Sequence, residues 1–340
     1  MAYTTINKHT AYFNTKLYTG NASTQSITGV GFQPDMVWTK SRGNQNNHNI
    51  YDAVRGATKR VYPNSNSAEA TTTNTLTSFD SDGFSLGDQD NVNASGITMA
   101  SWNWKANGSS TTTNNDGATT SYISHNSTAQ FSIIKYTGTG SSTNIGHGLN
   151  GTPDWFIVKA LSASDWHVWC NNFPAQKRIK LNSNGGWNTN SSIFASLPDA
   201  TKIYFGGGGD VNGSGVDYIC YAWKNVTGFS QAGSFIGNDD SNGTYCYTGF
   251  KPQFVFYRNV SQTENWEIAD ATRSPSNIVN KIIYANLSNA EVTTNRLDIL
   301  SNGFKARINN TANNGNGDVI IYLAFGQSLV GSNNVPCTAR

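Results

Sequence analysis

The stretch Gly31–Trp38 (GFQPDMVW) occurs twice more in similar form, as Gly151–Val158 (GTPDWFIV) and Gly249–Phe256 (GFKPQFVF). Each copy is a turn with Gly and Pro that leads directly into an apolar, aromatic run. Gly adopts backbone angles that other residues avoid and Pro cannot donate to a β-ladder, so the pair is typical of a turn or the first residue of a strand. The apolar run predicts a strand buried between two layers. Repetition of the whole stretch predicts three copies of one structural unit.

A second apolar run closes each copy, at a nearly constant distance after its proline. These closing runs are Trp102–Lys105, Tyr221–Lys224 and Leu323–Gly326. Alternate residues share one face of a strand, so the large apolar residues at every second position predict a stripe that faces the core. We expect the following side chains to be largely inaccessible: Trp102, Trp104, Tyr221, Trp223, Leu323 and Phe325.

The repeat also predicts the organisation of the chain. Short strands, evenly spaced turns and the lack of a helical period predict an all-β protein of three tandem β-sandwich repeats, each resembling a jelly roll. Residues 107–128 are nearly all Gly, Ser, Thr, Asn and Asp, which is typical of a linker. We expect an N-terminal arm (1–12), a first unit (13–106), this linker (107–128), a second unit (129–226), a third unit (227–326) and a C-terminal arm (327–340).

The composition argues against several classes of protein. Charged residues make up 13% of the chain and the net charge is +2, whereas a dedicated nucleic-acid binder would carry clustered Lys and Arg. Many Asn, Thr, Trp and Tyr with few charges are typical of extended β proteins outside the cytoplasm or on particle surfaces. The first residues lack the basic and apolar regions of a signal peptide, and no apolar run is long enough to span a membrane. We therefore expect neither nucleic-acid binding nor membrane insertion.

The cysteines do not form a recognisable metal or redox motif. Cys170, Cys220, Cys246 and Cys337 have no C-x-x-C spacing. Cys170 and Cys220 lie in expected strands, where free buried thiols behave as small hydrophobic side chains. Since the sequence has no export signal, this interpretation is favoured over a disulfide.

Catalytic residues cannot be assigned from spacing. Glycoside cleavage needs two acids that face one cleft, and nothing in the sequence indicates that Asp217, Asp270 and Glu267 converge. The run Gly206–Gly209 lacks the Lys of a phosphate-binding loop, so it predicts a flexible turn. The scattered histidines predict ordinary polar surface positions: His48, His125, His147 and His167. We expect no enzymatic activity, no cofactor and no metal.

Two groups of residues leave alternatives open. Asp80, Asp82, Asp88 and Asp90 crowd one turn and would suit Ca²⁺, although a solvated Asp-Gly turn is the favoured interpretation. Four tryptophans lie outside the repeated core positions, among Asn, Asp and Ser: Trp166, Trp169, Trp187 and Trp266. They are either exposed contacts for a ligand or partner, or they close the edges of the sandwiches.

Four runs of the first unit resemble a known family. They are Leu17–Asn21, Ile27–Trp38, Tyr51–Gly56 and Leu76–Phe84. Together they resemble the repeat of virion structural and tail-fibre-like proteins of tailed bacteriophages, especially marine and cyanobacterial phages. The match is close over about a quarter of the chain; the second unit lacks the Tyr-Asp-x-x-Arg run, and the third keeps an echo of it in Ala269–Arg273. The family has no catalytic motif to carry over, so the resemblance implies a place on the virion.

The resemblance implies two functions. One is a tail-fibre-like adhesion component that binds a host surface glycan or receptor; it predicts arms docked inward and exposed loops such as His167–Asn172 and Trp187–Asn190. The other is a capsid decoration or cement protein that stabilises the phage head, with an arm, Met1–Tyr12 or Gln327–Arg340, laid on a neighbouring subunit. In both, the partners are other virion proteins of the capsid or tail.

Overall fold

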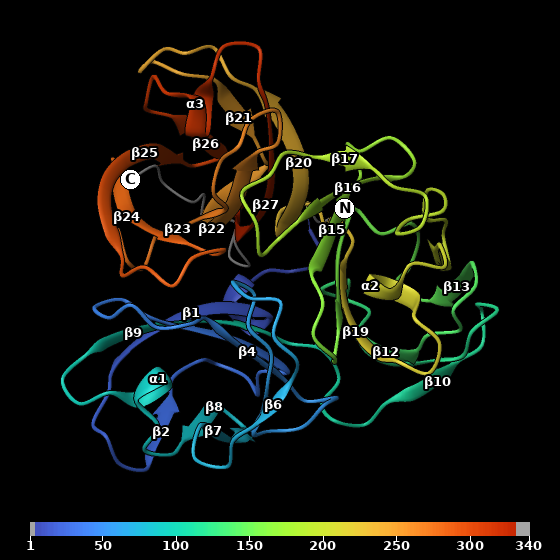
Figure 1. Ribbon diagram of the computed structural model, residues 1–340. Coiled ribbons are helices and arrows are strands. Elements are labelled where there is room, and N and C mark those ends of the chain that lie inside the picture. Colours follow the sequence, from blue (N-terminus) through green and yellow to red (C-terminus); the bar gives the residue numbers. More distant parts are fainter. Residues whose placement is uncertain (1–3, 331–340) are drawn as a thin grey trace.

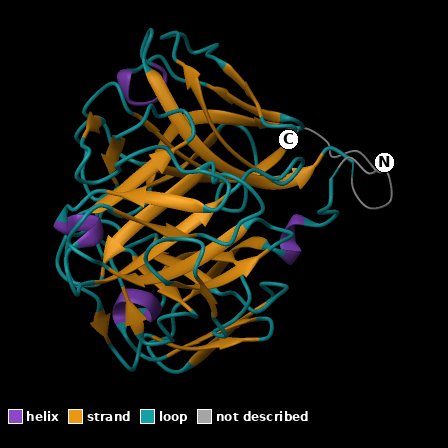
Figure 2. Ribbon diagram, turned by 90° about the vertical axis from the view of Figure 1, so that its right-hand side faces the viewer, coloured by secondary structure: helices purple, strands orange, loops and turns teal. Residues whose placement is uncertain are grey.

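Antiparallel strands make up most of the protein, which was analysed as a computed structural model that describes residues 4–330 (Figures 1 and 2). Helices are restricted, in this part of the chain, to one 3₁₀ turn and three single-turn α-helices. The prediction of an all-β protein is therefore confirmed. In Figure 1 the first unit (blue) lies at the bottom, the second (green to yellow) at the right and the third (orange to red) at the top.

The elements follow one plan in each unit. The first unit and the segment before it contain η1 (His9–Ala11), β1 (Phe13–Thr19), β2 (Gln25–Thr28), β3 (Met36–Ser41), β4 (Asn49–Asp52), β5 (Lys59–Arg60), β6 (Ala70–Thr71), β7 (Leu76–Asp80), β8 (Gly83–Leu86), α1 (Asp90–Asn93) and β9 (Thr98–Trp104). The second contains β12 (Phe131–Thr137), β13 (Thr143–Gly146), β14 (Trp155–Ala160), β15 (Trp166–Cys170), β16 (Lys177–Lys180), β17 (Asn188–Thr189), β18 (Lys202–Phe205), α2 (Gly209–Asn212) and β19 (Asp217–Trp223). The third contains β20 (Ser230–Ile236), β21 (Tyr245–Tyr247), β22 (Phe250–Asn259), β23 (Glu267–Asp270), β24 (Val279–Tyr284), β25 (Val292–Leu300), β26 (Gly303–Ala306), α3 (Thr311–Asn314) and β27 (Val319–Ser328).

The same order of strands occurs in the main sheet of each unit. It is β1-β9-β3-β4 in the first, β12-β19-β14-β15 in the second and β20-β27-β22-β23 in the third. The register agrees as well, because the residue two positions after each proline pairs with the closing aromatic residue. These pairs are Met36 with Trp104, Trp155 with Trp223, and Phe254 with Phe325. A superposition of the three whole units stays a prediction.

The turns before these strands show why the repeated stretch needs glycine. Gly31, Gly151 and Gly249 all have positive φ angles, of 93°, 117° and 76°, which side chains with a Cβ rarely adopt. Pro34 and Pro153 precede their strands, as expected. Pro252 instead lies inside β22, opposite Gly326, at an irregularity in the pairing.

A second layer of strands packs against each main sheet. The small sheets are β2-β8-β7 and β13-β18 in the first two units. In the third unit β24 connects the two layers, so that β20 and β21 are the two ends of one eight-stranded sheet. Between the layers lie separate apolar cores of the first and third units, around Phe84 and Phe304 respectively.

The second faces of the three main sheets meet in one shared aromatic core. Trp104 lies at its centre, with ring centroids 6.2 Å from Trp223 and 5.8 Å from Phe325. All six closing-strand residues expected to be inaccessible are buried, at 3% exposure or less. Ser230 pairs with Phe325 and so occupies the place of Phe13 and Phe131, while the ring of the preceding Phe229 packs against Phe325 at 5.8 Å.

Residues 107–128, expected as a linker, contain a β-hairpin. Its strands are β10 (Thr112–Asn114) and β11 (Ser121–Asn126), and β11 pairs with the edge strand β12. The composition concealed this hairpin because Ser and Thr serve strands as well as loops. The sheet of the second unit is thereby extended at its edge.

The described part of the N-terminal arm docks inward. Ile6 is buried in the shared core, His9 Nδ1 lies 2.8 Å from Oε1 of Gln327, and Gln327 donates to the carbonyl of Asn7. The first two residues of the expected C-terminal arm, 327 and 328, therefore belong to β27. Residues 1–3 and 331–340, with Cys337, lie outside the described residues.

One repeated residue was not recognised in the sequence. A buried Asn ends each single-turn helix, and its side chain accepts from one turn and donates to the carbonyls of others. These residues are Asn93, Asn212 and Asn314, each within a similar run (VNASG, VNGSG and NNGNG). The side-chain amide of this Asn thus binds backbone groups that no strand pairs with, at the point where the chain turns into the closing strand.

Truncation of the central ring tests the shared core. We expect Trp104→Ala to lower the free energy of unfolding by about 3–5 kcal/mol, because it leaves a large cavity among rings from all three units. Chemical denaturation measures this loss, and Tyr122→Ala, at a side chain that is 48% exposed, is the matched control. A loss for Trp104→Ala no greater than that of the control would contradict the shared core.

Candidate functional site

The three units are joined by equivalent hydrogen bonds. At the head of β4, β15 and β23, a ring nitrogen lies within hydrogen-bond distance of a backbone carbonyl of a neighbouring unit. The pairs are His48 with Tyr284 (3.0 Å), Trp166 with Tyr62 (2.9 Å) and Trp266 with Lys180 (2.8 Å). Each unit therefore contacts both others in a cyclic arrangement.

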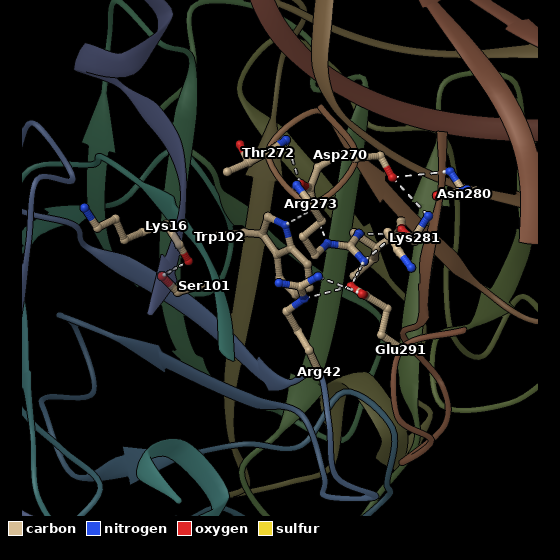
Figure 3. A network of polar contacts seen from close by, with 12 residues as sticks. Lys16, Arg42, Ser101, Trp102, Asp270, Thr272, Arg273, Asn280, Lys281 and Glu291 are labelled. Atoms are coloured by element: carbon tan, nitrogen blue, oxygen red, sulfur yellow. Dashed lines mark hydrogen bonds and ion pairs between the residues drawn. The ribbon is translucent and has the colours of Figure 1, made fainter. Parts of the chain in front are cut away.

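The junction between the third and first units contains a buried network of charges (Figure 3). Arg273 donates to Asp270 and to Glu291, and the indole of Trp102 donates to Asp270 at 3.1 Å. Arg42, from the first unit, reaches Glu291 at 2.8 Å, and this hydrogen bond raises the pKa of Arg42. Every acid here is paired with an arginine, which compensates for the loss of water around buried charges.

The junction between the first and second units contains a corresponding network, in which Leu161 stands at the position of Arg42. Arg55 pairs with Asp52 and Glu69, while Tyr221 of the second unit donates its hydroxyl to Asp52 at 2.7 Å. Burial alone would lower the pKa of Arg55, but Asp52, Tyr221 and Glu69 raise it. Arg55 thus remains charged within the protein.

The third junction has apolar residues at the corresponding positions. Cys170 pairs with Trp155 as Asp52 and Asp270 pair with Met36 and Phe254. Three residues later stands Phe173, whose ring packs edge-on against Trp187 at 5.3 Å. The backbone N–H of Trp187 donates to a backbone carbonyl of the third unit. The N–H groups of Glu69 and Glu291 donate in the same way to carbonyls of the units next to theirs. An aromatic pair therefore replaces an ion pair.

The structure places the four tryptophans for which the sequence leaves two positions open, exposed contacts or sandwich edges. Trp166, Trp169 and Trp266 are buried, with exposed fractions of 0%, 3% and 0%. The interpretation as exposed contacts is wrong for these three, because Trp166 and Trp266 bond to neighbouring units and Trp169 stacks on Phe156 of its own unit at 5.2 Å. Trp187 is half-buried, and the ammonium of Lys177 lies 4.8 Å from its ring.

The histidines also differ from the expectation of surface positions. His48, His147 and His167 are fully buried and His125 is half-buried. Burial lowers the pKa of the first three, which favours neutral rings at pH 7. They serve as hydrogen-bonding core residues.

The acids considered for catalysis or metal binding have local partners. Glu267 pairs with Arg296, Asp270 with Arg273, and Asp217 with Lys135. The residues of the acidic turn bond separately, with Asp80 to Ser78 and Ser85, Asp82 to the amides of Gly29 and Gly31, and Asp88 to Asn74. Within residues 4–330, no group of three or more His, Cys, Asp or Glu is placed to hold a metal ion.

The structure reveals a groove at the third junction that sequence analysis did not find. We call it the β20–β21 groove; it has a volume of about 430 Å³. None of its lining residues is charged. They are Asn171, Asn172, Asn225, Gln231, Ala232, Gly233, Ser234, Phe235, Tyr245, Cys246, Tyr247 and Tyr322.

Two tyrosines give the groove its exposed aromatic surface. Tyr245 and Tyr247 alternate with Cys246 along β21 and are 43% and 56% exposed. Burial raises the pKa of the Cys246 thiol to about 11, so the thiol is neutral at pH 7. Exposed aromatic rings beside amide side chains bind uncharged polar partners through stacking and hydrogen bonds. The Tyr-Cys-Tyr alternation was the one sequence signal for this surface.

Comparisons with known proteins place the chain in a family without a described function. The structure defines an all-β protein with an uncharged surface groove. The chain belongs to the family described as a domain of unknown function, DUF7483, which it matches over residues 8–328. No curated protein and no solved structure matches it. None of the helices within residues 4–330 is long and apolar enough to cross a membrane.

Exchange of one junction for another tests their equivalence. We expect Arg55→Met to cost about 3–5 kcal/mol of unfolding free energy, since it leaves Asp52 buried without its cation. The combined change Asp52→Cys, Arg55→Phe, Glu69→Trp and Tyr221→Leu copies the third junction and should cost less than the single change. Denaturant titration of both variants measures this, and a larger loss in the combined variant would refute the equivalence.

A buried basic residue also recurs six positions after each proline: Lys40, Lys159 and Arg258. Lys40 donates to the carbonyls of Ser41 and Asn44, and Lys159 to those of Ala160 and Ser162. Burial lowers the pKa of both lysines to about 8. Their charged forms are therefore disfavoured in the folded protein relative to the unfolded chain.

These lysines predict a rise in stability with pH. Between about pH 8 and pH 10 the unfolded chain binds more protons than the folded protein, so the free energy of unfolding should increase by about 1–2 kcal/mol per lysine. Denaturation at several pH values should show a smaller rise for Lys40→Met with Lys159→Met than for the unchanged protein. The exposed Lys8→Met is the control, and equal slopes in all three would contradict the prediction.

Proposed function

We propose that this protein is a non-enzymatic structural component of a tailed-bacteriophage virion, exposed on the particle as an adhesion component that contacts the host surface. The observation that carries the proposal is the β20–β21 groove, whose exposed tyrosines and amides form an uncharged contact surface. The resemblance of the first unit to virion and tail-fibre-like repeats supports the same place of action.

The chemistry of the groove suits recognition. Tyr245 and Tyr247 offer large, rigid contact area with a hydroxyl each, at a low cost in side-chain entropy. Asn171 and Asn172 are exposed beside them and can both donate and accept hydrogen bonds. Such a surface binds through many modest contacts and is insensitive to salt, because none of its residues is charged.

The rest of the molecule supports an extracellular role. Buried networks and rings fix the three units to one another, so the groove lies on a rigid body. The described part of the N-terminal arm docks inward at Gln327, which the adhesion role predicts. Of the loop His167–Asn172 expected to be exposed in that role, only Asn171 and Asn172 are exposed; that expectation is wrong for residues 167–170, which form the buried strand β15.

Binding assays with matched variants test the proposal. Labelled protein should bind host cells or a host receptor or glycan, and Tyr245→Ala with Tyr247→Ala should weaken this binding at least about tenfold, as expected for aromatic residues at the centre of a contact. Tyr122→Ala, at an equally exposed tyrosine on β11, should have no effect.

The same assay distinguishes the adhesion role from the alternative role on the capsid. Stable attachment to purified capsids without binding to cells, receptors or glycans would overturn the adhesion role in favour of a capsid decoration or cement protein. Equal loss of binding in the double variant and in Tyr122→Ala would contradict a specific contact through the groove.

A further inference from the structure

The second unit holds a strand of its own at the place that corresponds to the β20–β21 groove. Strand β11 pairs along the free edge of β12, from Ser121 opposite Tyr136 to Asn126 opposite Phe131. The residues just before β11 follow β13, where the amide of Thr119 donates to Asn144 and the hydroxyl of Ser121 to Gly146. Residues 118–126 therefore fill the space between β12 and β13.

In the third unit, β20 and β21 occupy the positions of β12 and β13. Both β12 and β20 pair with the closing strand of their unit. Strand β13 pairs with β18 and β21 pairs with β26, the strands that precede α2 and α3. The groove is lined by Gln231–Phe235 of β20 and by Tyr245–Tyr247 of β21. The connection from β19 to β20 spans only residues 224–229, which is too short to supply a hairpin such as β10–β11.

A side chain satisfies this free edge of β20 at one residue, next to Ser230, which pairs with the backbone of Val226. The amide of Asn225 accepts from the backbone N–H of Ala232 at 2.6 Å and donates to its carbonyl at 3.3 Å. Ala232 corresponds to Ile133, which pairs with Ser124 of β11. Asn225 thus takes the place of a peptide group of an added strand. Ser234, two residues further, directs its backbone groups to the same side, since alternate residues of a strand do so.

We propose that the β20–β21 groove receives an extended strand of another protein chain, antiparallel to β20 and alongside β21. The strand would be uncharged and would alternate apolar and hydroxyl side chains, as Ser121–Asn126 does. Backbone hydrogen bonds to the sheet edge supply affinity in such an arrangement, and alternate side chains supply specificity. This inference rests on the proposed function, because it names the partner of the same groove.

Strand addition and glycan binding make opposite demands on Asn225. A glycan would use the amide of Asn225 as a hydrogen-bonding group, so its removal would weaken binding. An incoming strand must displace this amide from Ala232, so its removal would strengthen binding. The two classes of ligand can therefore be separated by a single substitution.

The probe is a synthetic peptide with the sequence of residues 118–126 (ATTSYISHN), titrated up to millimolar concentration against the full chain. We expect saturable binding, with protection of Ala232–Ile236 in hydrogen exchange. Asn225→Ala should bind about tenfold more tightly, and Ser234→Pro about tenfold more weakly, as expected when a backbone hydrogen bond is gained or lost. Ser234→Ala, which keeps the N–H, and a scrambled peptide are the controls.

Two results would overturn the inference. One is the absence of saturable binding by the peptide, and the other is binding that Ser234→Pro and Ser234→Ala affect equally. If tyrosine-dependent binding to host cells persists in either case, the proposed function stands and the ligand is a glycan. If the peptide binds as expected but the protein does not bind host cells, the groove serves assembly of the virion and the host-contact role fails.

Discussion

Burial of the second face of each main sheet is the constraint on which the structure depends. One face is covered by the small sheet of the same unit, but the other carries rings such as Trp104, Trp223 and Phe325 that only the neighbouring units can cover. The three units therefore share one core and cannot be rigid bodies on flexible linkers. Any polar group at their junctions is removed from water and must find a partner there.

The junctions show two solutions to this constraint. Asp52 and Asp270 each hold an arginine and a hydrogen-bond donor from the next unit, whereas the third junction has Cys170, Phe173 and the ring of Trp187. Replacement of a complete buried ion network by apolar residues can be neutral, while removal of one member leaves a charge unpaired. A change at one position of such a network is therefore costly unless the other positions change with it.

Much of the fold was readable from the sequence, because period-two stripes and Gly-Pro turns are local signals. The buried closing strands around Trp104 and Trp223 and the positive φ angles of the glycines followed from them. The positions of Trp166 and Trp266 did not, since their covering residues come from other units and flanking Asn and Ser suggested a surface. The hairpin in residues 107–128 was missed because Ser-Thr composition does not distinguish loops from strands.

The groove itself was not predicted, because it arises where the third unit, within residues 4–330, lacks a strand that the second unit has. Its lining combines the loop after β15, the side chain of Asn225 and the two ends of the eight-stranded sheet, which are far apart in the chain. Free sheet edges invite unwanted pairing, and proteins usually protect them with charges or prolines. On β20 the backbone of Val226 pairs with Ser230, and the hydroxyl of Thr244 donates to the carbonyl of Ile236. Between them, Ala232 is protected by the neutral amide of Asn225, which a peptide group can displace with little loss of hydrogen bonding. An edge protected in this reversible way remains soluble alone and stays competent to accept a strand.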